Sequence, residues 1–119
     1  MKRPLVVFTA TLFAVITGSG WAMPAIFKTY EVPTTYSLPA RISIDTKGHI
    51  WFIESDSNKI GKFQFSREHF TEFDIPTTGS FPSDIIIGRD KKVWFTEQNA
   101  NQLGVFDPVS GAFKEYDIP

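Results

Sequence analysis

Short apolar runs separated by polar turns predict eight β-strands along most of the chain. The runs are rich in Ile, Val, Phe, Trp and Tyr, the residues that favour strands, and no stretch after residue 22 has helical periodicity. The turns carry Gly, Asn, Asp and Pro, as in Thr46-Lys47-Gly48. We expect strands near residues 40–45, 49–54, 59–64 and 70–75, and near 83–88, 92–97, 102–107 and 113–118. The pattern predicts an all-β fold.

The second set of strands repeats the first. Trp51-Phe52-Ile53-Glu54 returns as Trp94-Phe95-Thr96-Glu97, and residues 34–76 and 77–119 are identical at 17 of 43 positions. Four antiparallel strands in a repeat of about 40 residues are typical of a β-propeller blade. The sequence therefore predicts a partial β-propeller with two four-stranded blades.

One more strand is expected before the first repeat. Residues 27–33 align with the last strand of each repeat, so Phe27–Val32 is predicted to be a lone outer strand of an adjoining blade. Propellers have about four to eight blades, and two blades alone leave large apolar faces exposed. Two interpretations stay open: blades missing from this chain cover these faces, or the chain associates with other copies or chains through them.

Residues 1–22 have the pattern of a signal peptide. Lys2 and Arg3 precede an uncharged apolar run, and Gly20 and Ala22 stand at the −3 and −1 positions of a cleavage site. The alternative is a membrane anchor, because the uncharged run is long enough to be considered, although glycines and a proline interrupt it. We expect export to the periplasm or outside the cell, with no membrane attachment after cleavage.

Composition argues against nucleic-acid binding and excludes every site or cross-link that needs cysteine. A formal net charge of −1 gives no electrostatic basis for nucleic-acid binding. The chain has no cysteine, which excludes disulfides and cysteine-ligated metals.

Hairpin geometry points to two glutamates as candidate site residues. With a three-residue turn at 46–48, antiparallel pairing places Ala40 opposite Glu54, and the same rule places Ser83 opposite Glu97. The first strand of a blade lines the central channel, so both pairs should lie at one rim of that channel. A carboxylate there can bind a cation. Alternatively, each glutamate ends a strand and accepts hydrogen bonds from a neighbouring blade.

The other polar residues have simpler interpretations. His49 is expected at the far end of its hairpin from Glu54, and His69 before the outermost strand, so both are predicted to be surface residues. Asp56-Ser57-Asn58 is a turn, since it lacks the carboxylate density of a calcium loop.

The repeated motifs resemble those of the streptogramin B lyase (virginiamycin B lyase) family. The pattern Trp-Phe-x-Glu, then Asn-x-(Ile/Leu)-Gly, then (Phe/Tyr)-x-Ile-Pro occurs in residues 39–76 and again in 82–119. The resemblance implies a seven-bladed propeller and a lyase that opens a cyclic depsipeptide by elimination, with Mg²⁺ and a histidine base. It implies that Glu54 or Glu97 is a metal ligand. The family's histidines correspond to Ala40 and Ser83, so the general base is missing from both blades.

Three classes of function follow. The chain is a fragment or short member of the lyase-like propellers that is not catalytically competent alone, a non-catalytic module that binds a ligand or protein, or a structural unit whose blade faces stack with other chains. The absent histidines favour the last two over a working enzyme.

Overall fold

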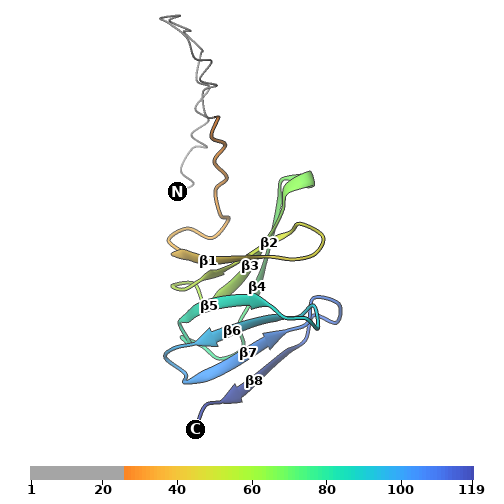
Figure 1. Ribbon diagram of the computed structural model, residues 1–119. Coiled ribbons are helices and arrows are strands. Elements are labelled where there is room, and N and C mark those ends of the chain that lie inside the picture. The colour runs from red at the N-terminus through yellow and green to blue at the C-terminus, as the bar shows by residue number, and fades with distance from the viewer. Residues whose placement is uncertain (1–25) are drawn as a thin grey trace, which may run out of the picture. The chain divides into compact units, whose positions relative to one another are not determined.

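The computed structural model describes residues 26–119. Residues Val32–Pro119 form one compact unit, and residues 26–31 belong to a separate unit that precedes it. The compact unit contains two antiparallel sheets of four strands, in the orders β1-β2-β3-β4 and β5-β6-β7-β8. Figure 1 shows the two sheets one after the other, with β1 and β5 close together. We call the first sheet blade one and the second sheet blade two, and they confirm the predicted partial propeller.

Strand positions agree with the sequence prediction to within one residue at each end. A short 3₁₀ helix, Phe65–Arg67, joins β3 to β4. The strands are β1 Pro39–Ile44, β2 Ile50–Glu54, β3 Lys59–Gln64, β4 His69–Asp74, β5 Pro82–Ile87, β6 Val93–Glu97, β7 Gln102–Phe106 and β8 Phe113–Asp117.

The predicted pairing is right near the turns and wrong at the other end of each hairpin. Ile44 pairs with Ile50, as expected, but Glu54 pairs with Pro39 instead of Ala40. In blade two Glu97 pairs with Pro82 instead of Ser83. The cause is a β-bulge in each first strand, which inserts one extra residue and shifts the register beyond it.

The predicted strand at Phe27–Val32 is absent from the structure, which has no strand between residues 26 and 38. Strand propensity alone does not make a strand, because the backbone needs a neighbouring strand to complete its hydrogen bonds. Each sheet already has its own outermost strand, β4 or β8. An adjoining blade that could pair with residues 27–33 is not among the two sheets, so the assignment of these residues to its outer strand stays a prediction.

The two blades pack through unlike faces. We call the side of blade one that carries Trp51 its tryptophan face and the opposite side its phenylalanine face, and the same names apply to the equivalent sides of blade two. The tryptophan faces comprise Trp51, Ile53, Ile60, Phe73 and Ile75 in blade one, and Trp94, Thr96, Leu103, Tyr116 and Ile118 in blade two. The phenylalanine faces comprise Ile42, Ile44, Phe52, Phe63 and Phe70 in blade one, and Ile85, Ile87, Phe95, Phe106 and Phe113 in blade two.

The core lies between the tryptophan face of blade one and the phenylalanine face of blade two. Phe106 of blade two lies 6.0 Å from Trp51 and 4.5 Å from Phe73 between ring centroids. Trp51, Ile53 and Phe106 are at most 1% exposed. Burial of large apolar side chains here provides the main stabilisation of the junction.

A close contact between motifs explains the repeated glycine. Gly61 pairs with Phe52, and Gly104 pairs with Phe95, on neighbouring strands. The phenylalanine ring lies directly over the glycine, in the space that a Cβ would occupy. The Phe of Trp-Phe-x-Glu and the Gly of Asn-x-(Ile/Leu)-Gly therefore form one packing unit.

Candidate functional site

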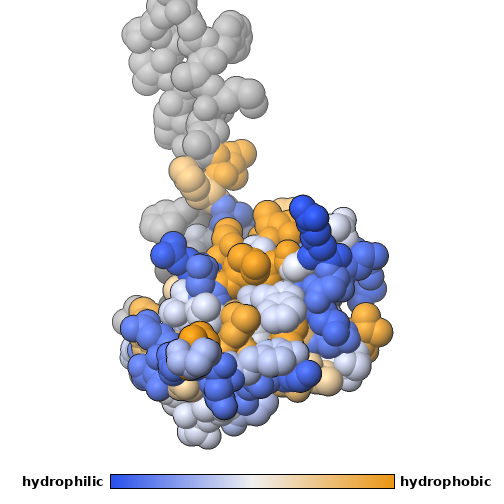
Figure 2. Space-filling view, turned by 60° about the horizontal axis from the view of Figure 1, so that its bottom comes forward, coloured by the Kyte–Doolittle hydropathy of each residue, from blue (hydrophilic) through white to orange (hydrophobic). Residues whose placement is uncertain are grey.

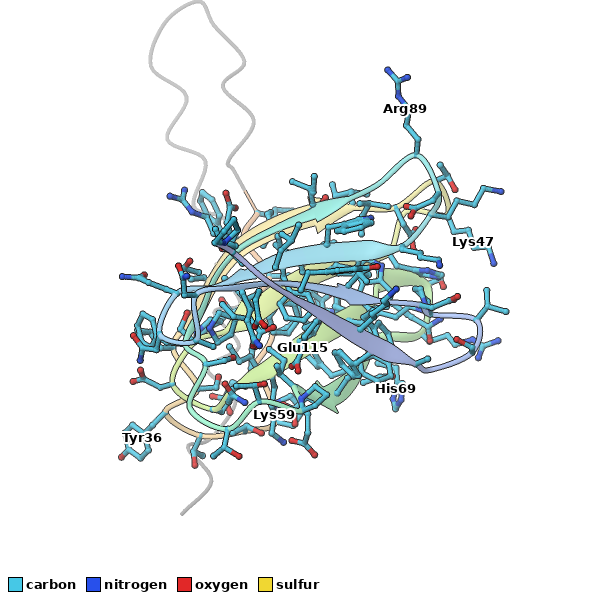
Figure 3. The ribbon with its side chains drawn as sticks, turned by 90° about the horizontal axis from the view of Figure 1, so that it is seen from below. Tyr36, Lys47, Lys59, His69, Arg89 and Glu115 are labelled. Atoms are coloured by element: carbon cyan, nitrogen blue, oxygen red, sulfur yellow. The ribbon has the colours of Figure 1, made fainter. Side chains whose placement is uncertain are left out.

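The two glutamates lie at the same end of their blades, away from the first hairpin turns. Figure 3 shows Lys47 and Arg89, which lie in the β1–β2 and β5–β6 turns, at one end of the molecule and Tyr36 at the other. Glu54 ends β2 at the Tyr36 end, where the backbone of Ser55 and Asp56 bonds to Leu38 and Ser37. Glu97 has the equivalent position at the end of β6.

Both carboxyl groups are buried, which the sequence did not predict. Glu54 is 0% exposed and Glu97 is 1% exposed. Removing a carboxylate from water favours its protonated form. Burial accordingly raises the pKa of both side chains above the usual range.

Glu54 has partial compensation for its burial. The Ser57 hydroxyl donates a hydrogen bond to Glu54 Oε2 (3.2 Å), while Glu54 Oε1 has no partner. Burial raises the pKa of Glu54, the negative charge of Glu72 raises it further, and Ser37, Ser57 and Lys59 oppose the increase. Lys59 pairs with Glu54 across β2 and β3, so a cation is available close to this carboxyl group.

Glu97 has less compensation. Neither of its oxygens has a hydrogen-bond partner. Ser80 lies beside it and opposes the rise in pKa caused by burial, but the Ser80 hydroxyl also bonds to Asn58 Oδ1 (2.9 Å). The residue opposite Glu97 on β7 is Gln102, where blade one has Lys59. Glu97 is therefore the least compensated buried charge in the described part of the chain.

A second pair of glutamates fastens the segment that leads into each blade. Glu72 Oε1 and Oε2 accept hydrogen bonds from Thr34 N (3.0 Å) and Thr34 Oγ1 (2.8 Å). Glu115 accepts the same two bonds from Thr77, at 3.1 and 2.9 Å. Burial raises the pKa of Glu72, but the bonds from Thr34 and the charge of Lys59 outweigh it and lower the pKa overall. Each glutamate therefore holds the segment that leads into its blade against β4 or β8. We call each of these Thr–Glu hydrogen-bonded pairs a clasp.

The positions that correspond to the family's histidines lie on the first strand of each blade. Ala40 pairs with Ile53, and Ser83 Oγ lies 2.9 Å from Thr96 Oγ1. Neither residue carries a group that accepts a proton near neutral pH. The bulges place Pro39 and Pro82, rather than these residues, opposite the glutamates.

The histidine predictions are half right. His69 is exposed, as expected. His49 is only 19% exposed, because its Nδ1 lies 2.9 Å from Asp45 Oδ2 and Gln64 packs against its Nε2. His49 and Glu54 lie at opposite ends of β2, separated by about 16 Å of extended chain. His49 therefore supports the β1–β2 turn.

The residues at Glu54 and Glu97 do not form a metal centre by themselves. Magnesium favours six oxygen ligands in octahedral geometry. Among residues 26–119, no group of three or more His, Asp or Glu side chains is arranged to hold a metal ion. Each blade offers one buried glutamate at this position, with Oε1 unpartnered in both.

Some residues at this end of the blades were missed by sequence reasoning. Asn58, which the sequence placed in a turn, donates to Ile75 O and Thr77 O and accepts from Ser80 N and Oγ, so it ties blade one to the start of blade two. The signal was available: Thr34, Ser37 and Asn58 are identical in the second repeat. Polar residues that are identical in the two repeats therefore indicate which side chains make hydrogen bonds in the blades.

The predicted signal peptide, residues 1–22, lies outside the described residues. In residues 26–119, there is no helix with the length and apolarity needed to cross a membrane.

Comparisons with known proteins agree with the motifs. The family model for the virginiamycin B lyase family matches residues 17–119. Selenomethionine-substituted virginiamycin B lyase from Staphylococcus aureus is similar, with 38% identity and a TM-score of 0.70. A catalytically inactive variant of that lyase with quinupristin has 38% identity and a TM-score of 0.71, and a streptogramin B lyase structure has 34% identity and a TM-score of 0.71. Comparison with curated proteins gives no match.

The matched region is a small part of those structures. The alignments cover 76% of this chain and 30% of each of the three lyases. The family model covers both blades and the segment before them. With its repeated motifs, its blade architecture and this match, the chain belongs to the virginiamycin B lyase family.

Proposed function

We propose that this chain supplies two blades of an exported, lyase-like propeller and is not catalytically competent by itself. One observation carries the proposal: the two positions that correspond to the family's catalytic histidines are Ala40 and Ser83. An elimination needs a general base within hydrogen-bond reach of the proton that it removes. Neither an alanine methyl group nor a neutral serine hydroxyl can serve.

The two histidines and the two buried glutamates of the described region do not replace the missing general base. His49 bonds to Asp45 at the far end of β2, and His69 is exposed at the start of β4. The buried Glu54 and Glu97 have raised pKa values, but they lie under the segments that lead into each blade. We therefore find, within residues 26–119, no general base that lies beside a positioned substrate site.

Magnesium binding by Glu54 or Glu97 stays a prediction from the family resemblance. Each glutamate would supply one carboxylate ligand, and the remaining ligands would be water, neutral protein oxygens or groups outside residues 26–119, because these residues contain no cluster of three or more acidic or histidine side chains. We therefore assign no catalytic step to a metal in this chain.

A ring-opening assay tests the proposal. Purified chain is incubated with quinupristin, the compound present in one of the similar lyase structures, with and without Mg²⁺. Elimination would give a linear isomer of unchanged mass and altered chromatographic retention. We expect no ring opening above the buffer rate in either condition. Turnover that depends on the protein would refute the proposal.

A second candidate is a non-catalytic module that binds a ligand or protein and assembles with other chains. The observation in its favour is the open tryptophan face of blade two, where Tyr116 is 41% exposed and Ile118 is 46% exposed. Quenching of tryptophan fluorescence by quinupristin, reduced in a Trp94→Phe variant, would support ligand binding on this face. Unchanged fluorescence would count against it.

Export is the remaining part of the proposal, and the basic, apolar and small-residue order of residues 1–22 supports it. Expression in a bacterial host should yield a periplasmic or secreted product whose N-terminus is Met23. A product that keeps residue 1 and stays with the membrane fraction would favour the anchor.

A further inference from the structure

The junction between the blades shows what each blade face needs as a partner. At this junction the tryptophan face of blade one covers the phenylalanine face of blade two. Ile75 is 4% exposed on the first face and Ile85 is 3% exposed on the second. The contact joins two different surfaces: the tryptophan face of one blade meets the phenylalanine face of the blade that follows it in the chain.

The chain carries a further example of each surface on its outer sides. The tryptophan face of blade two repeats that of blade one, and its Ile118, equivalent to Ile75, is 46% exposed. The phenylalanine face of blade one repeats that of blade two, and its Ile42, equivalent to Ile85, is 68% exposed. Ile44 on the same face is 61% exposed. The isoleucines at these equivalent positions are thus buried at the junction and exposed on the outer faces, whereas Phe52 and Phe63 of the phenylalanine face of blade one are only 5% exposed.

The aromatic rings of the outer faces already have the geometry of the junction. Trp51 and Phe73 are stacked at 6.0 Å and 20°, and Trp94 and Tyr116 are stacked at 6.4 Å and 13°. On the other surface the paired rings Phe63–Phe70 lie 4.5 Å apart at 36°, and Phe106–Phe113 lie 4.6 Å apart at 38°. Association would therefore need little rearrangement of the aromatic side chains.

Part of the exposed tryptophan face of blade two is hollowed. The hollow, of about 380 Å³, is lined by Trp94, Val105 and Tyr116 together with charged side chains that include Lys92 and Asp107. In blade one the equivalent ring pair receives Phe106 from the next blade. Hydrophobic side chains gather in the middle of the face shown in Figure 2 and hydrophilic ones surround them, a distribution typical of protein interfaces.

We propose that the occupant of this face is a second copy of the chain, which docks its blade one, through the phenylalanine face, on blade two of the first copy. The contact would continue the junction already present inside each chain. It deepens the proposed function, since it names the partner with which the two blades assemble. A head-to-tail contact of this kind forms a ring when the rotation closes. For propellers of about four to eight blades, closure needs about two to four copies.

The test uses two variants that each block one face. Ile42→Arg with Ile44→Arg blocks the phenylalanine face of blade one, and Tyr116→Arg with Ile118→Arg blocks the tryptophan face of blade two. All four side chains are more than 40% exposed, so the substitutions should leave the fold intact, which circular dichroism verifies. Val109→Arg is the matched control, because Val109 is 96% exposed in the β7–β8 loop and belongs to neither face.

Light scattering after size exclusion measures the mass of each purified protein. We expect wild type and Val109→Arg to have two to four times the chain mass, and each face variant to be a monomer. A 1:1 mixture of the two face variants should form a dimer, because one open face of each kind remains. A monomeric wild type, unchanged masses of the face variants, or a monomeric mixture would each overturn the proposal.

The same fractions separate this inference from the proposed function. Ring opening by any fraction would refute the proposed lack of activity and leave the masses as they are. A monomeric wild type without activity would refute the assembly alone and show that something other than a second copy covers the tryptophan face of blade two.

Discussion

Replacing Glu97 with glutamine should stabilise the protein at neutral and alkaline pH. Glu97 is 1% exposed, and neither carboxyl oxygen has a hydrogen-bond partner in the described structure. An unsatisfied buried polar group costs about 1–3 kcal/mol, and more when it is charged. The amide of Gln still needs partners, so we expect a net gain of about 1 kcal/mol. For a domain of this size that gain corresponds to a rise in Tm of about 4–8 °C.

The gain should depend on pH in a defined direction. Burial raises the pKa of Glu97 in the folded state above its ordinary value of 4.5. The folded protein then holds this proton more tightly than the unfolded chain, so the stability linked to Glu97 falls as pH rises from 4.5 through the folded-state pKa. Glutamine does not titrate. The stability difference between Glu97→Gln and wild type should therefore be larger at pH 8 than at pH 4.

Thermal unfolding at fixed protein concentration and at both pH values measures this difference. Glu54→Gln is the matched control, and its gain should be smaller, because Ser57 donates to Glu54 and Lys59 lies opposite it. A lower Tm for Glu97→Gln at pH 8, or an equal gain at pH 4 and pH 8, would refute the reasoning. So would stabilisation of wild type by Mg²⁺ that Glu97→Gln abolishes, because a metal ion would then be the missing partner.

Three further changes test the packing and hydrogen bonds described above. Asn58→Ala removes four hydrogen bonds at the blade junction and should lower the free energy of unfolding by about 2–3 kcal/mol. Asn101→Ala removes one hydrogen bond and should lower it by about 1 kcal/mol, as urea denaturation would measure. Equal losses would contradict the bridging role of Asn58. Gly104→Ala places a methyl group against the ring of the adjacent phenylalanine and should lower the free energy of unfolding by about 1–3 kcal/mol. Gly111→Ala has free space around the added methyl group but a φ of +73°, and should lower it by about 1 kcal/mol. The reverse order would argue against the ring contact. Asp45→Asn should lower the free energy of unfolding by about 1–2 kcal/mol at pH 7, because hydrogen bonds to the carboxylate outweigh burial and lower the Asp45 pKa to about 2. In thermal unfolding this loss should shrink as pH falls from about 4 to 2. A loss independent of pH would be inconsistent with that pKa.

Local patterns were enough to predict the strands, because strand propensity and turn residues act over a few neighbouring positions. The same patterns could not predict the pairing at the far end of each first hairpin. The bulge near Arg41, whose φ is +44°, adds one residue without any change in the apolar pattern. A hairpin register counted outward from the turn is correct only until the first bulge.

The conformation of Phe27–Val32 shows a different limit of sequence patterns, because these residues form no strand in the absence of an adjoining blade. Its residues resemble those of β4 and β8, so its intrinsic preference is the same as theirs. Whether such a segment is a strand depends on a partner that supplies backbone hydrogen bonds, which is a tertiary property. Sequence similarity to a strand therefore identified its equivalent position in the repeat and not its conformation.

The sequence predicted that the two glutamates end equivalent strands, but it did not predict their cross-strand partners or their burial. Glu54 and Glu97 were correctly placed at corresponding strand ends. Their burial depends on the segments before β1 and β5, which contain Ser37 and Ser80 and fold back over the strand ends. Such coverage is decided by loop geometry, which periodicity does not encode.

The clasp between Thr34 and Glu72, and its equivalent between Thr77 and Glu115, has a consequence for how such proteins change in length. Both partners of each clasp lie inside one 43-residue repeat. Duplication or deletion of one repeat in frame would therefore add or remove a blade together with the bonds that fasten its leading segment. Because such an event breaks no clasp, the number of repeats, and with it the number of blades, can change while every blade keeps the hydrogen bonds that hold its leading segment.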